Sequence, residues 1–389
     1  MAHRGTTRGI IEATPTALLV ALIAVRVLVA GVVIADAGRH GVDDPVVLRA
    51  HAVASSPASP WKGFPVASMP VETALMHVVG GDSPTGTAVR MALLAFVADL
   101  AVFVGVGFAW GRRAAGTYLL VALPLLPMLY RRFDLVSVAL ATWGAALLTR
   151  RGDDEVGGPG IAFALALWTK LWPVVLLPVL VLRRAQRSLI ATGGLVILGG
   201  VAWFFIGDKK APFQVLTLRD AVGWSVEGTV GSALRAFGLA GPSNTDGNTV
   251  RFGTVPGLAE PLLFLALLAL LGLVWWGASR EPRRDPFGAT SLASVAALLV
   301  CAPLVAAQYV AWLVPWTAVA FEADEAEREV AVASTLAIVL TGLTQLVTVG
   351  ESWVDAWLLF ARNLTLVAVV GLWLVPALLP RRPEAAHAA

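Results

Sequence analysis

The sequence predicts an all-α polytopic integral membrane protein, a bundle of about 10–12 transmembrane segments, because long apolar runs recur along the whole chain. Hydrophobic residues make up 57% of the 389 positions and charged residues only 14%. Soluble domains carry about 25% charged residues, so this composition argues against a water-soluble fold. The apolar composition predicts the lipid bilayer as a partner. The net charge is only +3, which gives no sign of nucleic-acid binding, so we predict no nucleic acid as a partner.

Composition also limits the kinds of site. Cys301 is the only cysteine, which excludes an intramolecular disulfide and a cysteine-based metal site. No second histidine or carboxylate stands at metal-ligand spacing near His77, and no glycine-rich nucleotide loop is evident. We therefore predict no metal site and no cofactor, while a need for a divalent metal stays open.

The first apolar run, residues 16–35, follows a basic tail that contains Arg4 and Arg8. At about 20 residues it exceeds the apolar region of a secretory signal, and no clear small-residue cleavage site follows it. We expect a retained transmembrane helix with its N-terminal tail in the cytoplasm.

The basic residues predict the topology, because cytoplasmic loops carry an excess of Lys and Arg. They give one membrane domain over residues 1–380, a cytoplasmic tail over 381–389, and two long extracytoplasmic loops over 37–87 and 207–257. The predicted spans are residues 15–36, 88–110, 114–130, 134–149, 160–182, 187–206, 258–278, 288–305, 307–321, 329–348 and 355–379.

The segment 160–182 interrupts the alternation of sides, because the residues on both of its flanks, 150–151 and 183–187, are rich in arginine. One continuous span would reverse the predicted membrane orientation of every segment downstream. Two half-helices that meet at Lys170 keep both flanks in the cytoplasm, and Pro173 suits the start of the second half-helix because no N–H is needed there. We predict this re-entrant pair, since irregular backbone is tolerated at membrane depth where it lines a cavity.

With this pair in place, the unusual polar features fall on one side of the membrane. They are the Arg-Arg-Phe-Asp turn at 131–134, Lys170, both long loops and the Ala-Ala-Gln-Tyr turn at 306–309. The turn at 131–134 lies there against the usual charge bias. We therefore predict a multi-pass protein of the plasma membrane with an extracytoplasmic working face.

Four charged residues lie inside predicted spans, where charge is costly: Arg26, Arg90, Asp99 and Arg362. Asp99 is deep and needs a partner, for which Arg26 and a polar group of a helix are the candidates, and we expect its role to be structural. Arg90 and Arg362 lie near the outer ends of their spans, where their side chains could extend to the headgroups.

Two loops carry candidate chemistry. Asp43 and Asp44 follow the first span, where a buried carboxylate could act as general base on an alcohol, and the alternative is a helix cap. Trp224 and Glu227 suit sugar binding, because aromatic faces pack on C–H surfaces and carboxylates accept hydroxyl hydrogen bonds. The alternative there is an amphipathic surface helix capped by Ser225.

Several short motifs follow one another along the chain. They are DDPVVLRAHA at 43–52, PWKGFPVASMP at 60–70, RRFDLVSVAL at 131–140, ALALWTKLWPVVLLPVLVLRR at 164–184, WSVEGTVGSAL at 224–234, AAQYVAWLVP at 306–315 and ARNLTLV at 361–367. In this order they resemble the GT-C membrane glycosyltransferases, and most closely the polyprenol-phosphate-mannose-dependent mannosyltransferase-like group, glycosyltransferase family 87. The chain departs from that pattern at Arg49, Trp61, Gly63, Ala67, Ser68, Ala306 and Ala307.

The resemblance implies a GT-C-like fold and inverting transfer of a sugar, without a nucleotide, from a polyprenyl-phosphate donor to a glycolipid or glycan acceptor. It assigns Asp44, with Asp43 as its substitute, as the general base, and Arg131, Arg132 and Lys170 as ligands of the donor phosphate. It assigns the sugar or acceptor to Trp224, Glu227, Gln308 and Tyr309.

Two other functions stay open at this stage. A flippase for a lipid-linked saccharide needs a polar path through both leaflets, whereas the polar residues here cluster at one face. A membrane assembly protein without catalysis agrees with the replacement of the acidic residues by Gly63 and Ala67.

Overall fold

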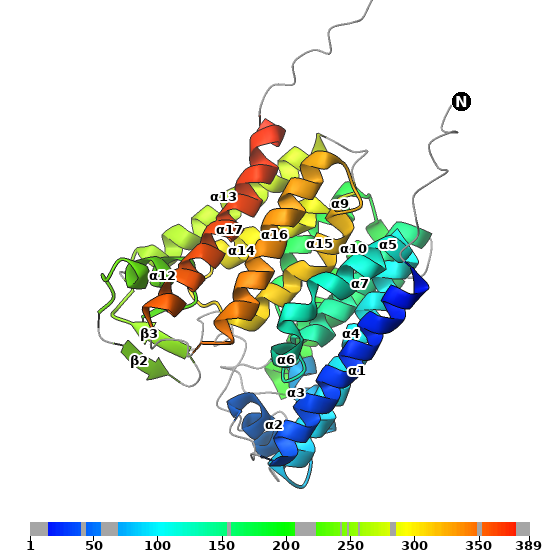
Figure 1. The fold of residues 1–389 in the computed structure, drawn as a ribbon. Coiled ribbons are helices and arrows are strands. Elements are labelled where there is room, and N and C mark those ends of the chain that lie inside the picture. The colour runs from blue at the N-terminus through cyan, green and yellow to red at the C-terminus, as the bar shows by residue number, and fades with distance from the viewer. Residues whose placement is uncertain are drawn as a thin grey trace, which may run out of the picture.

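A computed structural model describes residues 15–39, 44–55, 69–153, 157–206, 223–241, 243–246, 249–255, 257–280, 285–347 and 352–378. Nearly all regular structure in these ranges is helical (Figure 1). Five of the helices are long and apolar enough to cross a membrane: α1 (Thr16–Arg39), α4 (Pro84–Trp110), α10 (Gln186–Ile206), α13 (Ala259–Ser279) and α17 (Trp353–Leu378). The prediction of a helical membrane protein is confirmed at this level.

Three of the predicted spans are broken helices, because proline has no N–H to donate within a helix. A proline stands in the first turn of six of the resulting pieces, η1, α6, α8, η2, α9 and α15. The pieces are α5 (Arg112–Val121), η1 (Leu123–Leu125), α6 (Leu126–Leu129), α8 (Gly158–Thr169), η2 (Trp172–Leu176), α9 (Pro178–Leu182), η4 (Ala307–Leu313) and α15 (Val314–Ala320).

Three further helices, α7 (Asp134–Arg151), α14 (Ala289–Cys301) and α16 (Glu325–Thr344), complete the bundle. Residues 289–297 of α14 are all buried, so this helix forms part of the core between its neighbours α13 and α17. Three short helices lie in the connecting segments: α2 (Pro45–Ser55), α3 (Pro70–Val79) and α12 (Thr229–Ala236).

A small antiparallel sheet in the second long loop was not expected from the sequence. β1 (Trp224–Ser225) and β2 (Ser243–Asp246) both pair with the central strand β3 (Thr249–Phe252). The sequence of β3, Thr-Val-Arg-Phe, is rich in β-branched and aromatic residues, which favour strands. The protein is therefore almost entirely helical, with one small local sheet in this loop.

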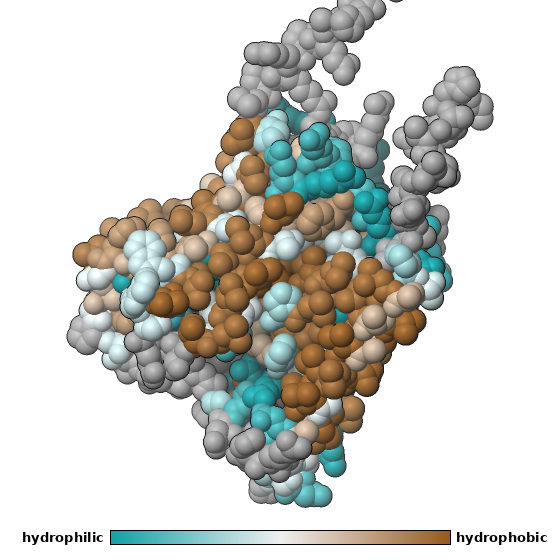
Figure 2. Space-filling model, viewed as in Figure 1, coloured by the Kyte–Doolittle hydropathy of each residue, from teal (hydrophilic) through white to brown (hydrophobic). Residues whose placement is uncertain are grey.

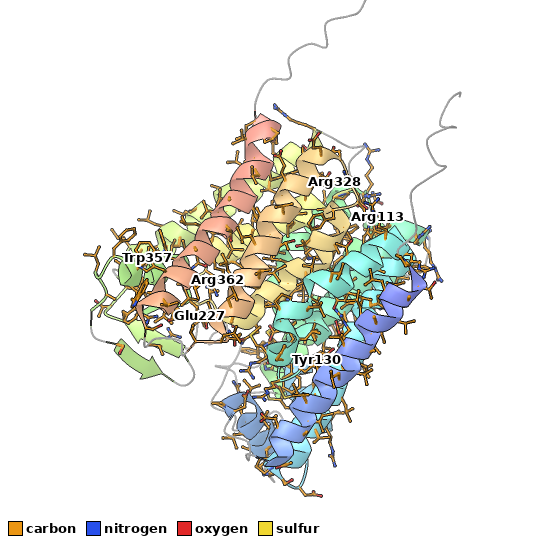
Figure 3. All side chains as sticks on the ribbon, in the orientation of Figure 1. Arg113, Tyr130, Glu227, Arg328, Trp357 and Arg362 are labelled. Atoms are coloured by element: carbon orange, nitrogen blue, oxygen red, sulfur yellow. The ribbon has the colours of Figure 1, made fainter. Side chains whose placement is uncertain are left out.

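The molecule has two polar ends separated by an apolar belt. The start of α1 and the end of α17 lie at the upper end in Figure 1, whereas α2, α3 and the sheet lie at the lower end. Figure 2 shows hydrophobic surface between hydrophilic patches at these two ends. At the upper end, Arg113 Nε lies 3.3 Å from Glu322 Oε2, and Arg113 and Arg328 mark this end in Figure 3.

The segment from α8 to α9 begins and finishes at the same end of the bundle. Asp153, which precedes α8, accepts hydrogen bonds from the backbone N–H of Ser188 at 2.8 Å and from its hydroxyl at 2.7 Å. Between these flanks the helix stops at Lys170, whose backbone is extended. This geometry agrees with two half-helices that meet at Lys170.

A charged network in the helix bundle joins α1, α4, α5 and the end of α6. Asp99 accepts hydrogen bonds from Arg26 Nε at 2.8 Å, from the Tyr118 hydroxyl at 2.5 Å and from the Tyr130 hydroxyl at 2.9 Å. All four side chains are completely or almost completely buried, and Arg26 Nη1 also donates to the carbonyl of Leu119 at 2.9 Å. The structure therefore pairs Asp99 with Arg26, as the sequence predicted.

Replacing Asp99 by alanine should destabilise the protein by about 3–5 kcal/mol, because the Arg26 guanidinium would stay buried without its counter-charge. Thermal or denaturant unfolding in detergent measures this loss. The exposed first-turn carboxylate of α13 provides the control, and Glu260→Ala should change stability by less than about 0.5 kcal/mol. The double variant Arg26→Leu/Asp99→Leu should be more stable than Asp99→Ala, and a lower stability would contradict this account.

Candidate functional site

The Arg-Arg turn after α6 is held by two carboxylates from the N-terminal part of the chain. Arg131 Nη2 lies 2.6 Å from Asp36 Oδ2, near the end of α1. Arg132 Nη1 lies 2.6 Å from Asp44 Oδ2, before α2, and also donates to the carbonyl of Arg131 at 2.8 Å. Arg132 Nε is buried and has no hydrogen-bond partner in the described part of the chain. This guanidinium therefore keeps a donor for a ligand.

Asp44 uses both of its oxygens. Oδ1 accepts from the backbone N–H of Val46 at 2.9 Å, which caps α2, while Oδ2 accepts from Arg132. The alternative prediction of a helix cap is thus confirmed for this residue. The carboxylate is partly exposed and lies beside a cation, so a ligand that draws Arg132 away would release an oxygen. Asp43 lies outside the described residues.

Lys170 is paired with a carboxylate that sequence reasoning did not assign to the site. Its Nζ donates to Glu72 Oε1 at 2.7 Å, and Glu72, in the first turn of α3, is only 6% exposed. A lysine inside an apolar segment is itself a signal that a counter-charge lies nearby, because an unpaired charge there is costly. The sequence could not choose Glu72, which lies 98 residues away.

Asp134 belongs to the same cluster as Lys170 and does not pair with the arginines beside it. It begins α7, is 2% exposed, and accepts from Trp312 Nε1 at 3.1 Å. It also lies within electrostatic range of Lys170 and Glu72. The side chain of Asp134 is therefore held by an indole of the neighbouring turn.

An aromatic stack lies against this cluster. The ring of Trp312 stacks on Tyr309 with centroids 4.4 Å apart and on Trp172 with centroids 5.3 Å apart. Tyr309 also lies within electrostatic range of Lys170. The turn that carries Gln308 and Tyr309 is thus brought to the tip of the α8–α9 segment, and both of these side chains are half-buried.

The second long loop is fastened to α17 through Glu227, and Figure 3 shows Glu227 beside Arg362 at the lower part of that helix. Arg362 Nη1 lies 3.2 Å from Glu227 Oε2, and Arg362 Nη2 donates to the Glu227 carbonyl. Asn363 donates to the same carbonyl at 3.1 Å and to Ser232 Oγ at 2.7 Å. Arg362 is completely buried, so the expectation that it extends to the headgroups is wrong. The half-buried carboxylate of Glu227 in the loop instead supplies its counter-charge.

Burial raises the pKa of Glu227 above the ordinary value of a glutamate, and the Arg362 guanidinium opposes that rise. The side chain is 18% exposed and lies within electrostatic range of Arg132. The charge of Arg132 therefore acts on the carboxylate of Glu227, although Arg362 is the cation that contacts it.

Trp224 and Gln308 come from two segments that a hydrogen bond from a side chain to a backbone carbonyl joins. Ser225 Oγ, next to Trp224, donates to the carbonyl of Val305 at 3.1 Å, just before the Gln308 turn. Trp224 is half-buried in β1 opposite Phe252. No hydrogen bond joins the side chain of Trp224 or Gln308 to the charged residues in the ranges that the structure describes.

The site is thus built from ion pairs and aromatic rings. Within the described ranges, no group of three His, Cys, Asp or Glu side chains could hold a metal ion. No family model, curated protein or solved structure matches the chain. Its chemistry is therefore inferred from the residues themselves.

Gly231 allows the loop to pack closely, since a Cβ there would lie 1.9 Å from the Ser225 carbonyl oxygen. Gly231→Ala should cost about 1–3 kcal/mol through this overpacking and should speed hydrogen–deuterium exchange in α12. Gly228→Ala is the matched control, because a Cβ there would lie 3.4 Å from the same oxygen at an ordinary φ of −72°. Equal exchange in the two variants would contradict this packing.

Proposed function

We propose that this chain is a membrane glycosyltransferase that moves a sugar from a polyprenyl-phosphate donor to a glycolipid or glycan acceptor. The sugar would be mannose or another hexose or pentose. The observation that carries the proposal is the Arg131–Arg132 turn, which is paired with Asp36 and Asp44 at one polar end of an apolar bundle. A cationic turn beside a carboxylate, at the boundary of an apolar belt, suits a donor whose lipid tail lies in the bilayer and whose phosphate lies at its surface.

The donor phosphate is assigned to the two arginines. Arginine binds phosphate oxygens through two parallel N–H groups. Arg132 has an unused Nε, and the pair between Arg131 and Asp36 is about half exposed, so water or a phosphate can exchange with its carboxylate. Stabilising the departing phosphate supplies the main electrostatic contribution to such a transfer.

Asp44 is assigned as the general base. The acceptor hydroxyl attacks the anomeric carbon, the bond from that carbon to the phosphate oxygen breaks, and the acceptor proton passes to Asp44. Attack opposite the leaving phosphate inverts the anomeric centre. We propose that the phosphate binds first, because a phosphate that engages Arg132 weakens the hold of this residue on Asp44, which lies 2.6 Å away.

The sugar or acceptor is assigned to Trp224, Glu227, Gln308 and Tyr309. Support comes from the contact between Ser225 and Val305, which joins the segments that carry them, and from the partial exposure of all four residues. Because Arg362 holds Glu227, the carboxylate is fixed in direction and has limited freedom to follow a ligand.

Transfer from radiolabelled polyprenyl-phosphate sugars in membranes tests this assignment. Asp44→Asn should lower the rate by about 10²–10⁴-fold, since it removes the general base while keeping an oxygen that can cap α2. Asp36→Asn is the matched control at the neighbouring ion pair and should retain most of the activity. Full activity of Asp44→Asn would exclude its role as base, and no transfer by the wild type with any such donor would exclude the proposed function.

We further propose that the lower end in Figure 1 faces away from the cytoplasm across the plasma membrane and that the α8–α9 segment is re-entrant. In a Cys301→Ser background, Asp82→Cys and Gly241→Cys should react with an impermeant maleimide added outside intact cells. Arg184→Cys and Ala326→Cys should react only after the membrane is opened. All four positions are exposed. Reaction of Arg184→Cys from outside would contradict the re-entrant arrangement.

A further inference from the structure

The surroundings of Lys170 argue against its expected role as a phosphate ligand. Its ammonium lies 2.7 Å from Glu72 and within electrostatic range of Asp134, and both carboxylates are more than nine-tenths buried. Two buried carboxylates share this one ammonium, and Asp134 also lies within electrostatic range of Arg132. A phosphate placed at Lys170 would be repelled by both carboxylates in a site with little water to screen them.

The Arg131–Arg132 turn differs in charge and in exposure. Its two cations balance Asp36 and Asp44, and the Arg131 and Asp36 side chains are 41% and 44% exposed. A phosphate can therefore exchange with the Asp36 carboxylate at the surface of the protein. Such an exchange is not open to Glu72, whose side chain is 8% exposed.

The Lys170 cluster has the groups that a sugar ring requires. Glu72 uses one oxygen for Lys170, and the other has no hydrogen-bond partner in the described part of the chain. Trp172 is 3% exposed, and its Nε1 is buried without a partner in the same ranges. Carboxylate acceptors for hydroxyl groups, an unpaired indole donor and a three-ring stack match a polyhydroxylated ring.

We propose that Glu72, Asp134 and Lys170, with the stack of Trp172, Trp312 and Tyr309, bind the sugar ring of the donor, while the arginine turn alone binds its phosphate. This assignment rests on the proposed function. Glu72 and Asp134 accept hydroxyl hydrogen bonds, Lys170 holds Glu72 in place and donates to a ring or hydroxyl oxygen, and Tyr309 covers one C–H face.

Binding to the purified full-length protein in nanodiscs distinguishes the contribution of the donor's sugar from that of its phosphate. The probes are a short-chain polyprenyl phosphate without sugar and the same lipid carrying mannose, with Kd measured by titration calorimetry. Glu72→Gln should weaken binding of the mannosyl lipid by at least about tenfold, the effect of losing a charged hydrogen bond, and should leave polyprenyl phosphate unchanged. Arg132→Gln should weaken both ligands by the same factor. Glu260→Gln, an exposed carboxylate at the same end, is the control and should change neither.

Melting temperatures verify that each variant folds, and Lys170→Arg provides a second variant that keeps the cation beside Glu72. It should weaken the mannosyl lipid selectively, because the larger guanidinium occupies the space of the ring. Equal weakening of both lipids by Glu72→Gln and Lys170→Arg, or no effect on either lipid, would overturn the sugar subsite while leaving the proposed function intact. Failure of the wild type to bind either lipid would overturn the proposed function, and the subsite with it.

Discussion

The buried salt bridge between Arg26 and Asp99 is the interaction on which the arrangement of the N-terminal helices depends. It puts opposite charges from α1 and α4 in one place, and the hydroxyl of Tyr130 binds the same carboxylate. Tyr130 immediately precedes Arg131, so the network fixes the point where the chain leaves the bundle. A purely apolar core could slide by a helical turn at modest cost, whereas a buried ion pair permits one register.

Ion pairs between distant segments assemble the polar end. Carboxylates from the first part of the chain meet cations from its middle, as in the pairs of Asp44 with Arg132 and of Glu72 with Lys170. The C-terminal part of the chain supplies a cation instead, since Arg362 on α17 binds the carboxylate of Glu227 in the second long loop. Each segment alone would leave a charge without a counter-charge near hydrocarbon, so the segments stabilise one another and hold the candidate site together.

The spans and the pairing of Arg26 with Asp99 could be predicted because apolar runs and isolated charges are local signals. The half-helix pair was predictable for the same reason, since arginines flank both of its ends. The sequence could not identify Glu72 as the partner of Lys170, because three-dimensional packing decides which distant carboxylate is buried. The position of Arg362 was also predicted wrongly, since the length of a span does not tell which face of a helix a loop covers. The strand β3 was missed because four residues give little periodicity.

The contact between Lys170 and Glu72 constrains biosynthesis. α8 has 12 residues, which at 1.5 Å each gives a rise of about 18 Å, short of the roughly 30 Å of hydrocarbon. A translocon would therefore not accept α8 as an independent span, and an unpaired lysine at membrane depth adds about 2.5–3.5 kcal/mol against insertion. Glu72 leaves the ribosome 98 residues earlier, so the counter-charge is already present when Lys170 is made. The contact with Glu72 therefore lowers the cost of placing this short, charged segment within the bundle.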